Sequence, residues 1–239
     1  MRRWEGLLLA IAAVTALFAA IGFFGGQDVK FIPASRPAGT AHAGLAAVVM
    51  SGDMGLDFGM GGQITNDFAA DGIPVIAINS LSFFRYRRTP AEVATLIDTV
   101  TRQALALPGI DRVVLIGQSF GADMLPYGLA SMPLALRARV TMVGLVVPGD
   151  AATFRASPSE IFSWSEPEVD AVPVARGLTW VPAVCIRGRE EARSLCPALT
   201  QPNMRQAVLP GGHPLRRNAS AVYKVLIANI DASTAGATP

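Results

Sequence analysis

The sequence predicts an α/β fold with a mostly parallel central sheet and helices on both of its faces. Short apolar runs alternate along the chain with segments in which apolar residues recur at helical spacing. Continuous apolar runs are typical of strands that are buried on both sides, as they are in parallel sheets. Right-handed crossovers then bring the carboxyl ends of the strands to one edge, where ligands bind.

The order of elements follows from these patterns between residues 45 and 231, which we expect to form one folded domain. Residues 27–44 are rich in Pro, Gly and Ala and predict a linker or a first irregular strand, and residues 232–239 predict a flexible tail. Residues 151–180 predict an excursion or cap between strands. The expected strands are 45–50, 73–78, 113–116, 140–147, 181–186 and 206–209. The expected helices are 64–70, 90–105, 120–130 and 218–230.

The best-marked helix start is Thr89-Pro90-Ala91-Glu92. Threonine at the N-cap, proline in the first turn and glutamate three residues after the cap form a capping-box pattern.

Composition narrows the class of protein. The chain is 51% hydrophobic and 16% charged, which supports a large core. Its formal net charge of +2 is too small to indicate binding to nucleic acid, so we expect no nucleic-acid partner. The oligomeric state is left open.

Residues 1–26 predict a signal peptide or an N-terminal membrane anchor. Arg2 and Arg3 precede a charge-free apolar run from Gly6 to Phe24, which is just long enough to cross a bilayer as a helix. Ala20-Ile21-Gly22 is a poor cleavage site, which favours an uncleaved anchor. In either case the positive-inside rule places the rest of the chain in a periplasm.

A nucleophile elbow is predicted at Gly117-Gln118-Ser119-Phe120-Gly121. An apolar strand precedes this Gly-x-Ser-x-Gly motif and a helix-compatible segment follows it. In the α/β-hydrolase fold such a turn exposes the serine hydroxyl, and the two glycines allow helix and strand to approach closely. The sequence therefore predicts an α/β-hydrolase with Ser119 as nucleophile.

The partners of Ser119 are chosen by their order in the chain. In α/β-hydrolases the acid and then the histidine follow the serine, which selects His213 and leaves His42 without a role. Glu191 follows the preceding strand and is the expected acid. Asp150, after the strand before, is the runner-up.

Glu190 is a further possible acid if its loop twists. The alternative reading of the Glu190-Glu191 pair is a solvated charged turn.

An oxyanion hole is expected in the glycine-rich loop Ser51-Gly52-Asp53-Met54-Gly55. We assign one donor to the backbone N–H of Asp53, or of Met54, and the other to the N–H of Phe120. The Lys-Ser/Thr ending of a phosphate-binding loop is missing.

One acidic and one sulfur-containing residue are assigned to substrate binding. Asp123, four residues after the nucleophile, is a candidate for recognising a cationic group, with helix-dipole pairing as the alternative. Met54 is the second candidate. No metal and no cofactor are expected.

Two further features have both a structural and a functional interpretation. We interpret the basic cluster of Arg85, Arg87 and Arg88 as part of an exposed loop rather than as a contact for an anionic phosphate. Cys185 and Cys196 predict a disulfide in an exported compartment, bracing the loop of Glu191. Two independent buried thiols are the alternative.

These motifs resemble the bacterial VirJ/AcvB virulence-protein family. Met54 and Leu56 depart from the glycine and tryptophan typical of the family loop, and Pro214 replaces a second histidine. The matching segments are Ser51-Gly52-Asp53, Arg88-Thr89-Pro90, the elbow extended through Ala122-Asp123 to Pro126, Gly188 with Glu191, Cys196-Pro197, and Pro210-Gly211-Gly212-His213.

The resemblance implies a periplasmic esterase that removes the aminoacyl group, lysyl or alanyl, from aminoacyl-phosphatidylglycerol. Its partner would be this lipid substrate at the membrane surface. Two alternatives stay open: a hydrolase acting on another ester or thioester, and a non-catalytic periplasmic accessory protein for virulence or secretion.

Overall fold

The computed structural model describes residues 3–20, 23, 25–156 and 168–235. Within this part of the chain, seven strands form one sheet in the order β1-β3-β2-β4-β5-β8-β9. Only β1 runs antiparallel to its neighbour. The strands are β1 (Val29–Ile32), β2 (Leu45–Met50), β3 (Val75–Ile78), β4 (Arg112–Gln118), β5 (Val140–Val146), β8 (Ala183–Gly188) and β9 (Met204–Leu209). The predicted fold class is confirmed.

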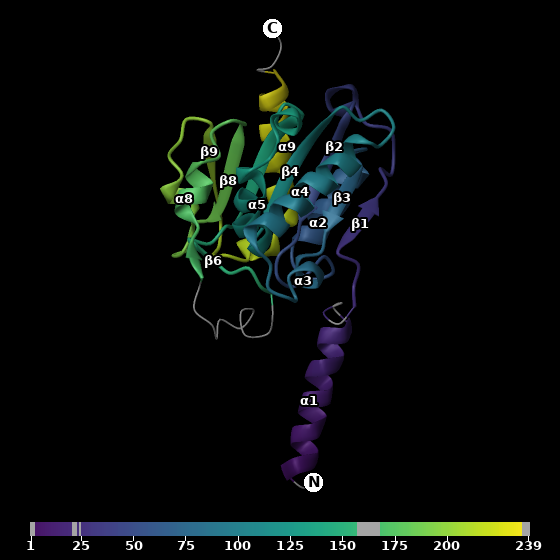
Figure 1. Ribbon diagram of the computed structural model, residues 1–239, viewed down its shortest axis with the longest axis vertical. Coiled ribbons are helices and arrows are strands. Elements are labelled where there is room, and N and C mark those ends of the chain that lie inside the picture. The colour runs from purple at the N-terminus through teal and green to yellow at the C-terminus, as the bar shows by residue number, and fades with distance from the viewer. Residues whose placement is uncertain (1–2, 21–22, 24, 157–167, 236–239) are drawn as a thin grey trace.

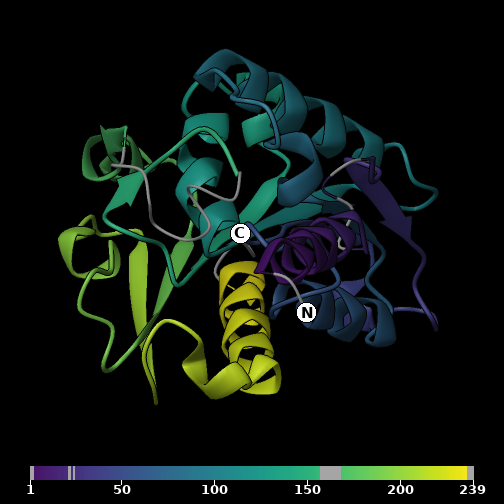
Figure 2. The ribbon, with the colours of Figure 1, turned by 90° about the horizontal axis from the view of Figure 1, so that it is seen from below.

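Helices cover both faces of the sheet (Figure 1). In the view turned by 90°, the yellow α9 and the blue α2 lie on one side of the sheet, and the teal α4 and α5 lie on the other (Figure 2). The longer helices are α1 (Arg3–Ala20), α2 (Gly61–Ala70), α4 (Pro90–Leu105), α5 (Phe120–Ala130) and α9 (Ala219–Ala235). The short ones are α3 (Ser80–Phe83), α6 (Leu134–Arg137) and α8 (Val172–Arg176), with 3-10 turns at Thr40–His42, Cys196–Ala198 and Leu215–Arg217.

The strand β2 shows why both faces must be covered. All six of its residues are buried, and successive side chains of a strand point to opposite faces. Ala46, Val48 and Met50 pack into the core beneath α4 and α5. Leu45, Ala47 and Val49 pack into the core beneath α2 and α9. A continuous apolar run is therefore the sequence signature of this central strand.

The capping box predicted for α4 is present. The Thr89 hydroxyl accepts a hydrogen bond from the N–H of Glu92 at 3.2 Å, and Oε2 of Glu92 accepts one from the N–H of Thr89 at 2.8 Å. The bond from the Thr89 N–H favours the charged form of the carboxyl and is the largest of the causes that lower the pKa of Glu92.

Some boundaries differ from those predicted, for reasons of packing. Helix α2 starts at Gly61, three residues earlier than expected, because glycine lets its first turn approach Ser51: a Cβ on Gly61 would lie 3.2 Å from the Ser51 Cα. The strand predicted at 181–186 is β8, which starts at Ala183 and continues to Gly188.

The two segments that flank the predicted domain also contain secondary structure. Strand β1 lies inside residues 27–44 and pairs with the outer edge of β3. Helix α9 continues through Ala235, and the hydroxyls of Ser233 and Thr234 donate to helix carbonyls four residues earlier. These parts of the predicted linker and tail therefore belong to the fold, and residues 236–239 lie outside the described residues.

The excursion predicted at 151–180 is described in part. It contains the antiparallel pair β6 (Ala151–Ala152) and β7 (Val169–Asp170), followed by α8. Residues 157–167, with Phe162 and Trp164, lie outside the described residues.

Helix α1 extends away from the domain as a single exposed helix (Figure 1). Its large apolar side chains that are exposed are Trp4, Leu7, Leu8, Leu9, Ile11, Val14 and Leu17. Among the helices of the described residues, none has both the length and the apolar character needed to span a membrane. The signal or anchor at residues 1–26 stays a prediction.

We expect Gly128→Ala to destabilise the domain, although alanine is the better helix former. A Cβ at Gly128 in α5 would lie 2.4 Å from Cγ1 of Ile97 in α4. Overpacking of this kind costs about 1–3 kcal/mol, and each kcal/mol lowers Tm by roughly 2–4 °C in a domain of this size.

Gly39→Ala is the matched control, because nothing lies within 4 Å of its Cβ position and its φ is −63°. Thermal unfolding followed by circular dichroism checks both variants. An unchanged Tm for Gly128→Ala would show that the α4–α5 contact relaxes freely.

Candidate active site

Ser119 lies at the turn between β4 and α5, in a backbone conformation that serine rarely adopts. Its φ is 52° and its ψ is −122°. Two glycines make room for this turn. A Cβ on Gly117 would lie 2.5 Å from the Gly121 oxygen, and one on Gly121 would lie 2.4 Å from the Met50 oxygen. The Gly-x-Ser-x-Gly spacing is therefore a steric requirement here.

His213 and Glu191 form a hydrogen-bonded chain with Ser119. Nε2 of His213 lies 2.7 Å from Oγ of Ser119, and Nδ1 of His213 lies 2.6 Å from Oε1 of Glu191. The histidine side chain is 50% exposed, whereas the glutamate side chain is 4% exposed. The structure thus brings together three residues that the sequence places 72 and 22 positions apart.

The loops that carry Glu191 and His213 are bound to each other. The N–H of Arg189 donates to the Leu209 oxygen at 2.9 Å, and the N–H of Glu190 donates to the Gly211 oxygen at 3.1 Å. A Cβ on Gly188 would lie 2.4 Å from the Gly211 oxygen. Glycine at 188 is therefore what allows the two loops to lie so close.

The second carboxylate oxygen of Glu191 has its own donor. Oε2 accepts a hydrogen bond from the N–H of Gly188 at 3.1 Å. With both oxygens engaged, the carboxylate is held in a fixed orientation toward the imidazole.

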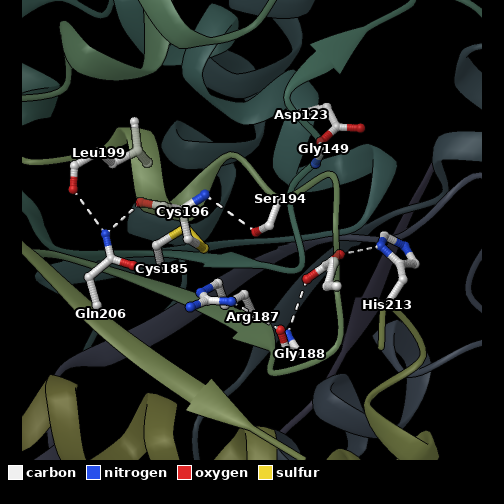
Figure 3. The surroundings of a disulfide bond; sticks show 11 residues. Asp123, Gly149, Cys185, Arg187, Gly188, Ser194, Cys196, Leu199, Gln206 and His213 are labelled. Atoms are coloured by element: carbon white, nitrogen blue, oxygen red, sulfur yellow. Dashed lines mark hydrogen bonds and ion pairs between the residues drawn. A yellow bond between two sulfur atoms is a disulfide. The ribbon is translucent and has the colours of Figure 1, made fainter. Parts of the chain in front are cut away.

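A disulfide closes the loop that contains Glu191. Cys185 in β8 and Cys196 are bonded, with an S–S distance of 2.06 Å, as predicted from the sequence. Nε2 of Gln206 in β9 donates to the Cys196 oxygen at 2.6 Å and to the Leu199 oxygen at 2.9 Å. In Figure 3 the disulfide and Gln206 lie on one side of Gly188 and His213 on the other.

The other candidate acids face different partners. Asp150 forms a salt bridge with Arg193, with 3.0 Å between Oδ1 and the guanidinium, so its carboxylate is not directed at His213. Glu190 is exposed. Glu191 is the acid that contacts the imidazole, and Asp150, the runner-up in the sequence, is not.

The predicted oxyanion loop lies beside Ser119. The N–H of Gly52 donates to Oε1 of the buried Gln118 at 3.2 Å, which fixes the loop to the elbow. Phe120 is the first residue of α5, so helix geometry gives its N–H no acceptor within the helix. The Phe120 N–H and the loop after β2 therefore stay the predicted oxyanion donors.

The Asp53 carboxyl is the unexpected feature of this loop. Burial raises its pKa, while the nearby His213 and the backbone N–H groups of Asp53 and Met54 act in the opposite direction.

A cavity of about 180 Å³ opens beside the nucleophile. Its lining includes Ser119, His213, Asp53 and Met54, together with Arg217. The sequence singled out the first four of these residues and missed Arg217, which had no motif to mark it.

Asp123 does not line this cavity. Its Oδ1 accepts a hydrogen bond from the N–H of Gly149 at 2.7 Å, and the two residues face each other in Figure 3. Burial raises the pKa of Asp123 well above its usual value, and the negative charges of Asp53 and Glu191 raise it further.

The remaining candidates lie away from the cavity. Arg87 pairs with Glu168 and Arg88 with Glu92, and the Arg85 guanidinium lies over the Tyr86 ring. None of these three arginines lines the cavity beside Ser119.

His42 is likewise remote from Ser119. Its Nε2 lies 2.9 Å from Oδ1 of Asp231 in α9, so this histidine joins the amino-terminal segment to the last helix.

Solved structures with the same fold have very different sequences. MenH from S. aureus has a TM-score of 0.61 and 11% identity, over 87% of this chain and 100% of its own. Carboxylesterase CesB from Bacillus subtilis has a TM-score of 0.57 and 12% identity, over 92% and 97%. Est1E from Butyrivibrio proteoclasticus has a TM-score of 0.56 and 12% identity, over 84% and 93%. This likeness identifies the α/β-hydrolase fold.

The curated proteins contain no significant match to the chain. A family model described as "Bacterial virulence protein (VirJ)" matches residues 44–234, which is most of the chain and includes every residue of the hydrogen-bonded site. The resemblance found in the sequence motifs is thereby confirmed: the chain belongs to the VirJ family of bacterial virulence proteins.

Proposed function

We propose that this protein is a serine esterase. The observation that carries the proposal is the hydrogen-bonded chain from Ser119 through His213 to the buried Glu191. A serine hydroxyl becomes nucleophilic when a base accepts its proton during attack. Esterases among the solved structures of the same fold add support for the reaction class.

The proposed reaction has two stages. Oγ of Ser119 bonds to the ester carbonyl carbon while Nε2 of His213 accepts its proton, and backbone N–H groups stabilise the oxyanion. The bond to the alcohol oxygen then breaks, and His213 returns the proton to that oxygen. Water, activated by the same histidine, releases the acyl group and regenerates Ser119.

We propose the aminoacyl ester of aminoacyl-phosphatidylglycerol, lysyl or alanyl, as the substrate. The family resemblance suggests this lipid, and one feature of the site supports it. Asp53 places a carboxyl in the cavity wall, where an α-ammonium group of the acyl part would find a partner.

The position of α1 supports a reaction at a membrane. Its last residue, Ala20, lines the same cavity as Asn79, just after β3, and Phe23 packs against Leu81 together with Met54. The apolar helix thus leaves the domain at the edge that carries Ser119. In this proposal residues 1–26 act in export or anchoring, and the enzyme works on the periplasmic side of the inner membrane.

The first test replaces the nucleophile. We expect Ser119→Ala to lower kcat on aminoacyl-phosphatidylglycerol by at least about 10³-fold, as loss of a nucleophilic serine does elsewhere. Purified protein is assayed for released amino acid, and a deletion strain complemented with either form is analysed for membrane aminoacyl-lipids. Equal lipid profiles from both forms would reject serine catalysis on these lipids and leave another ester, a thioester or a non-catalytic role.

The second test concerns the acid. We expect Glu191→Gln to lower kcat by roughly 10³–10⁴-fold, because the imidazole loses the carboxylate that holds its tautomer. Asp150→Asn is the matched control, since it removes one exposed salt bridge worth about 0–1 kcal/mol. A larger loss in Asp150→Asn than in Glu191→Gln would reverse the assignment.

Asp123 supports the structure and does not contact the substrate in this proposal. A raised carboxyl pKa means that the folded chain holds a proton that the unfolded chain has released. This part of the stability is therefore present at low pH and is lost as pH rises above about 4. We expect Asp123→Asn, which can still accept from Gly149, to gain in Tm relative to wild type from about pH 5 to pH 8.

The exposed Asp57→Asn is the control for that measurement, because it makes the same chemical change at a carboxyl on the surface. If Asp123→Asn instead altered the preference between lysyl and alanyl lipids, Asp123 would have the cation-binding role that the sequence suggested.

A further inference from the structure

The cavity beside Ser119 has opposite charges on its two sides. Asp53 follows β2, and Arg217 follows β9, and in the sheet these strands lie on opposite sides of β4, whose end carries Ser119. A substrate that enters the cavity therefore contacts a carboxyl from one side and a guanidinium from the other.

Arg217 differs from those arginines that pair with a carboxylate in the described residues. Arg36, Arg87, Arg88 and Arg193 each form such a salt bridge. Within the described ranges of the chain, the Arg217 guanidinium has no such partner, and its side chain is exposed at the cavity. Its charge is available to a ligand.

The backbone around Arg217 is held in an uncommon conformation. Leu215, Arg216 and Arg217 have φ values of 48°, 53° and 54°, so three consecutive residues other than glycine lie in the left-handed region. The buried Leu215 side chain anchors this turn in the core below α9. Strained segments of this kind concentrate at functional sites, where the surrounding structure maintains them.

The position of Arg217 relative to His213 indicates which part of an ester it would meet. In the proposed reaction His213 protonates the departing alcohol, so the alcohol lies on the histidine side of the scissile bond. Arg217 is four residues after His213, lies on the same loop and lines the same cavity. The acyl group, on the opposite side of the bond, lies toward Asp53.

We propose that Arg217 binds an anionic group on the alcohol part of the ester and thereby selects esters of phosphorylated alcohols. The guanidinium presents several N–H donors in a planar array that matches phosphate geometry. The inference rests on the proposed esterase function. The phosphate could belong to a lipid headgroup or to a free phosphorylated alcohol, because both offer the same oxygens.

The test compares two soluble substrates, the alanyl ester of glycerol 3-phosphate and the alanyl ester of glycerol, with the full chain. The readout is the ratio of their kcat/KM values. We expect Arg217→Gln to lower this ratio about tenfold, chiefly through KM, because the phosphate does not react. Arg217→Lys keeps the charge and is expected to restore most of the ratio.

Arg216→Gln is the matched control. It lies in the same left-handed turn, but its side chain lies over Gly211 and does not line the cavity. The proposal is overturned if Arg217→Gln leaves the ratio unchanged, or if Arg216→Gln lowers it equally. Alanyl-phosphatidylglycerol in detergent micelles then separates the two phosphate sources: a larger Arg217 effect on the micellar lipid favours the headgroup.

A binding experiment separates failure of this inference from failure of the esterase proposal. Ser119→Ala protein, which is not expected to turn over ester, is titrated with glycerol 3-phosphate and with glycerol by calorimetry. The titration is repeated with the double variant Ser119→Ala, Arg217→Gln. If this variant binds glycerol 3-phosphate more weakly but glycerol equally well, the inference is supported even if wild type hydrolyses neither ester. Equal binding in both backgrounds overturns it.

Discussion

The turn at Ser119 is the constraint on which the rest of the site depends. A serine with φ of 52° at the end of β4 holds its hydroxyl clear of the sheet, but only if the following helix can lie against neighbouring backbone. Gly117 and Gly121 meet that condition, since a Cβ on either would lie within 2.5 Å of a backbone oxygen. The same helix start leaves the Phe120 N–H without an intrahelical acceptor.

The other side of the site depends on keeping two loops close together. Glu191 follows β8 and His213 follows β9, and adjacent parallel strands bring their ends to the same edge. Gly188 allows the loops to touch, backbone hydrogen bonds join them, and the Cys185–Cys196 disulfide closes the glutamate loop. The imidazole can remain half exposed because its position is set by this backbone framework.

Two of the acidic side chains near the nucleophile are buried or paired within the protein. Asp123 lies behind the elbow with its carboxyl on the Gly149 N–H, and burial raises its pKa. Asp150 is paired with Arg193. Asp53 remains as the acidic side chain in the cavity wall, and Arg217 faces it from the other side. Charge in the cavity thus comes from residues on two loops, whereas the acids behind the cavity are engaged by the protein itself.

The sequence by itself determined the six parallel strands of the sheet, the elbow, the order of serine, acid and histidine, and the disulfide pair. These features rest on local rules: apolar periodicity, capping, steric limits at glycine, and the fixed order of loops along the strands. The tertiary structure decided what depends on contacts between distant segments. It selected Glu191 over Asp150, since Glu191 follows the strand next to β9 and contacts His213, whereas Asp150 pairs with Arg193. It also placed the Asp123 carboxyl on the Gly149 N–H, away from the cavity. It also brought Arg217 to the cavity, because the direction of a side chain on a left-handed turn depends on the core that anchors the turn.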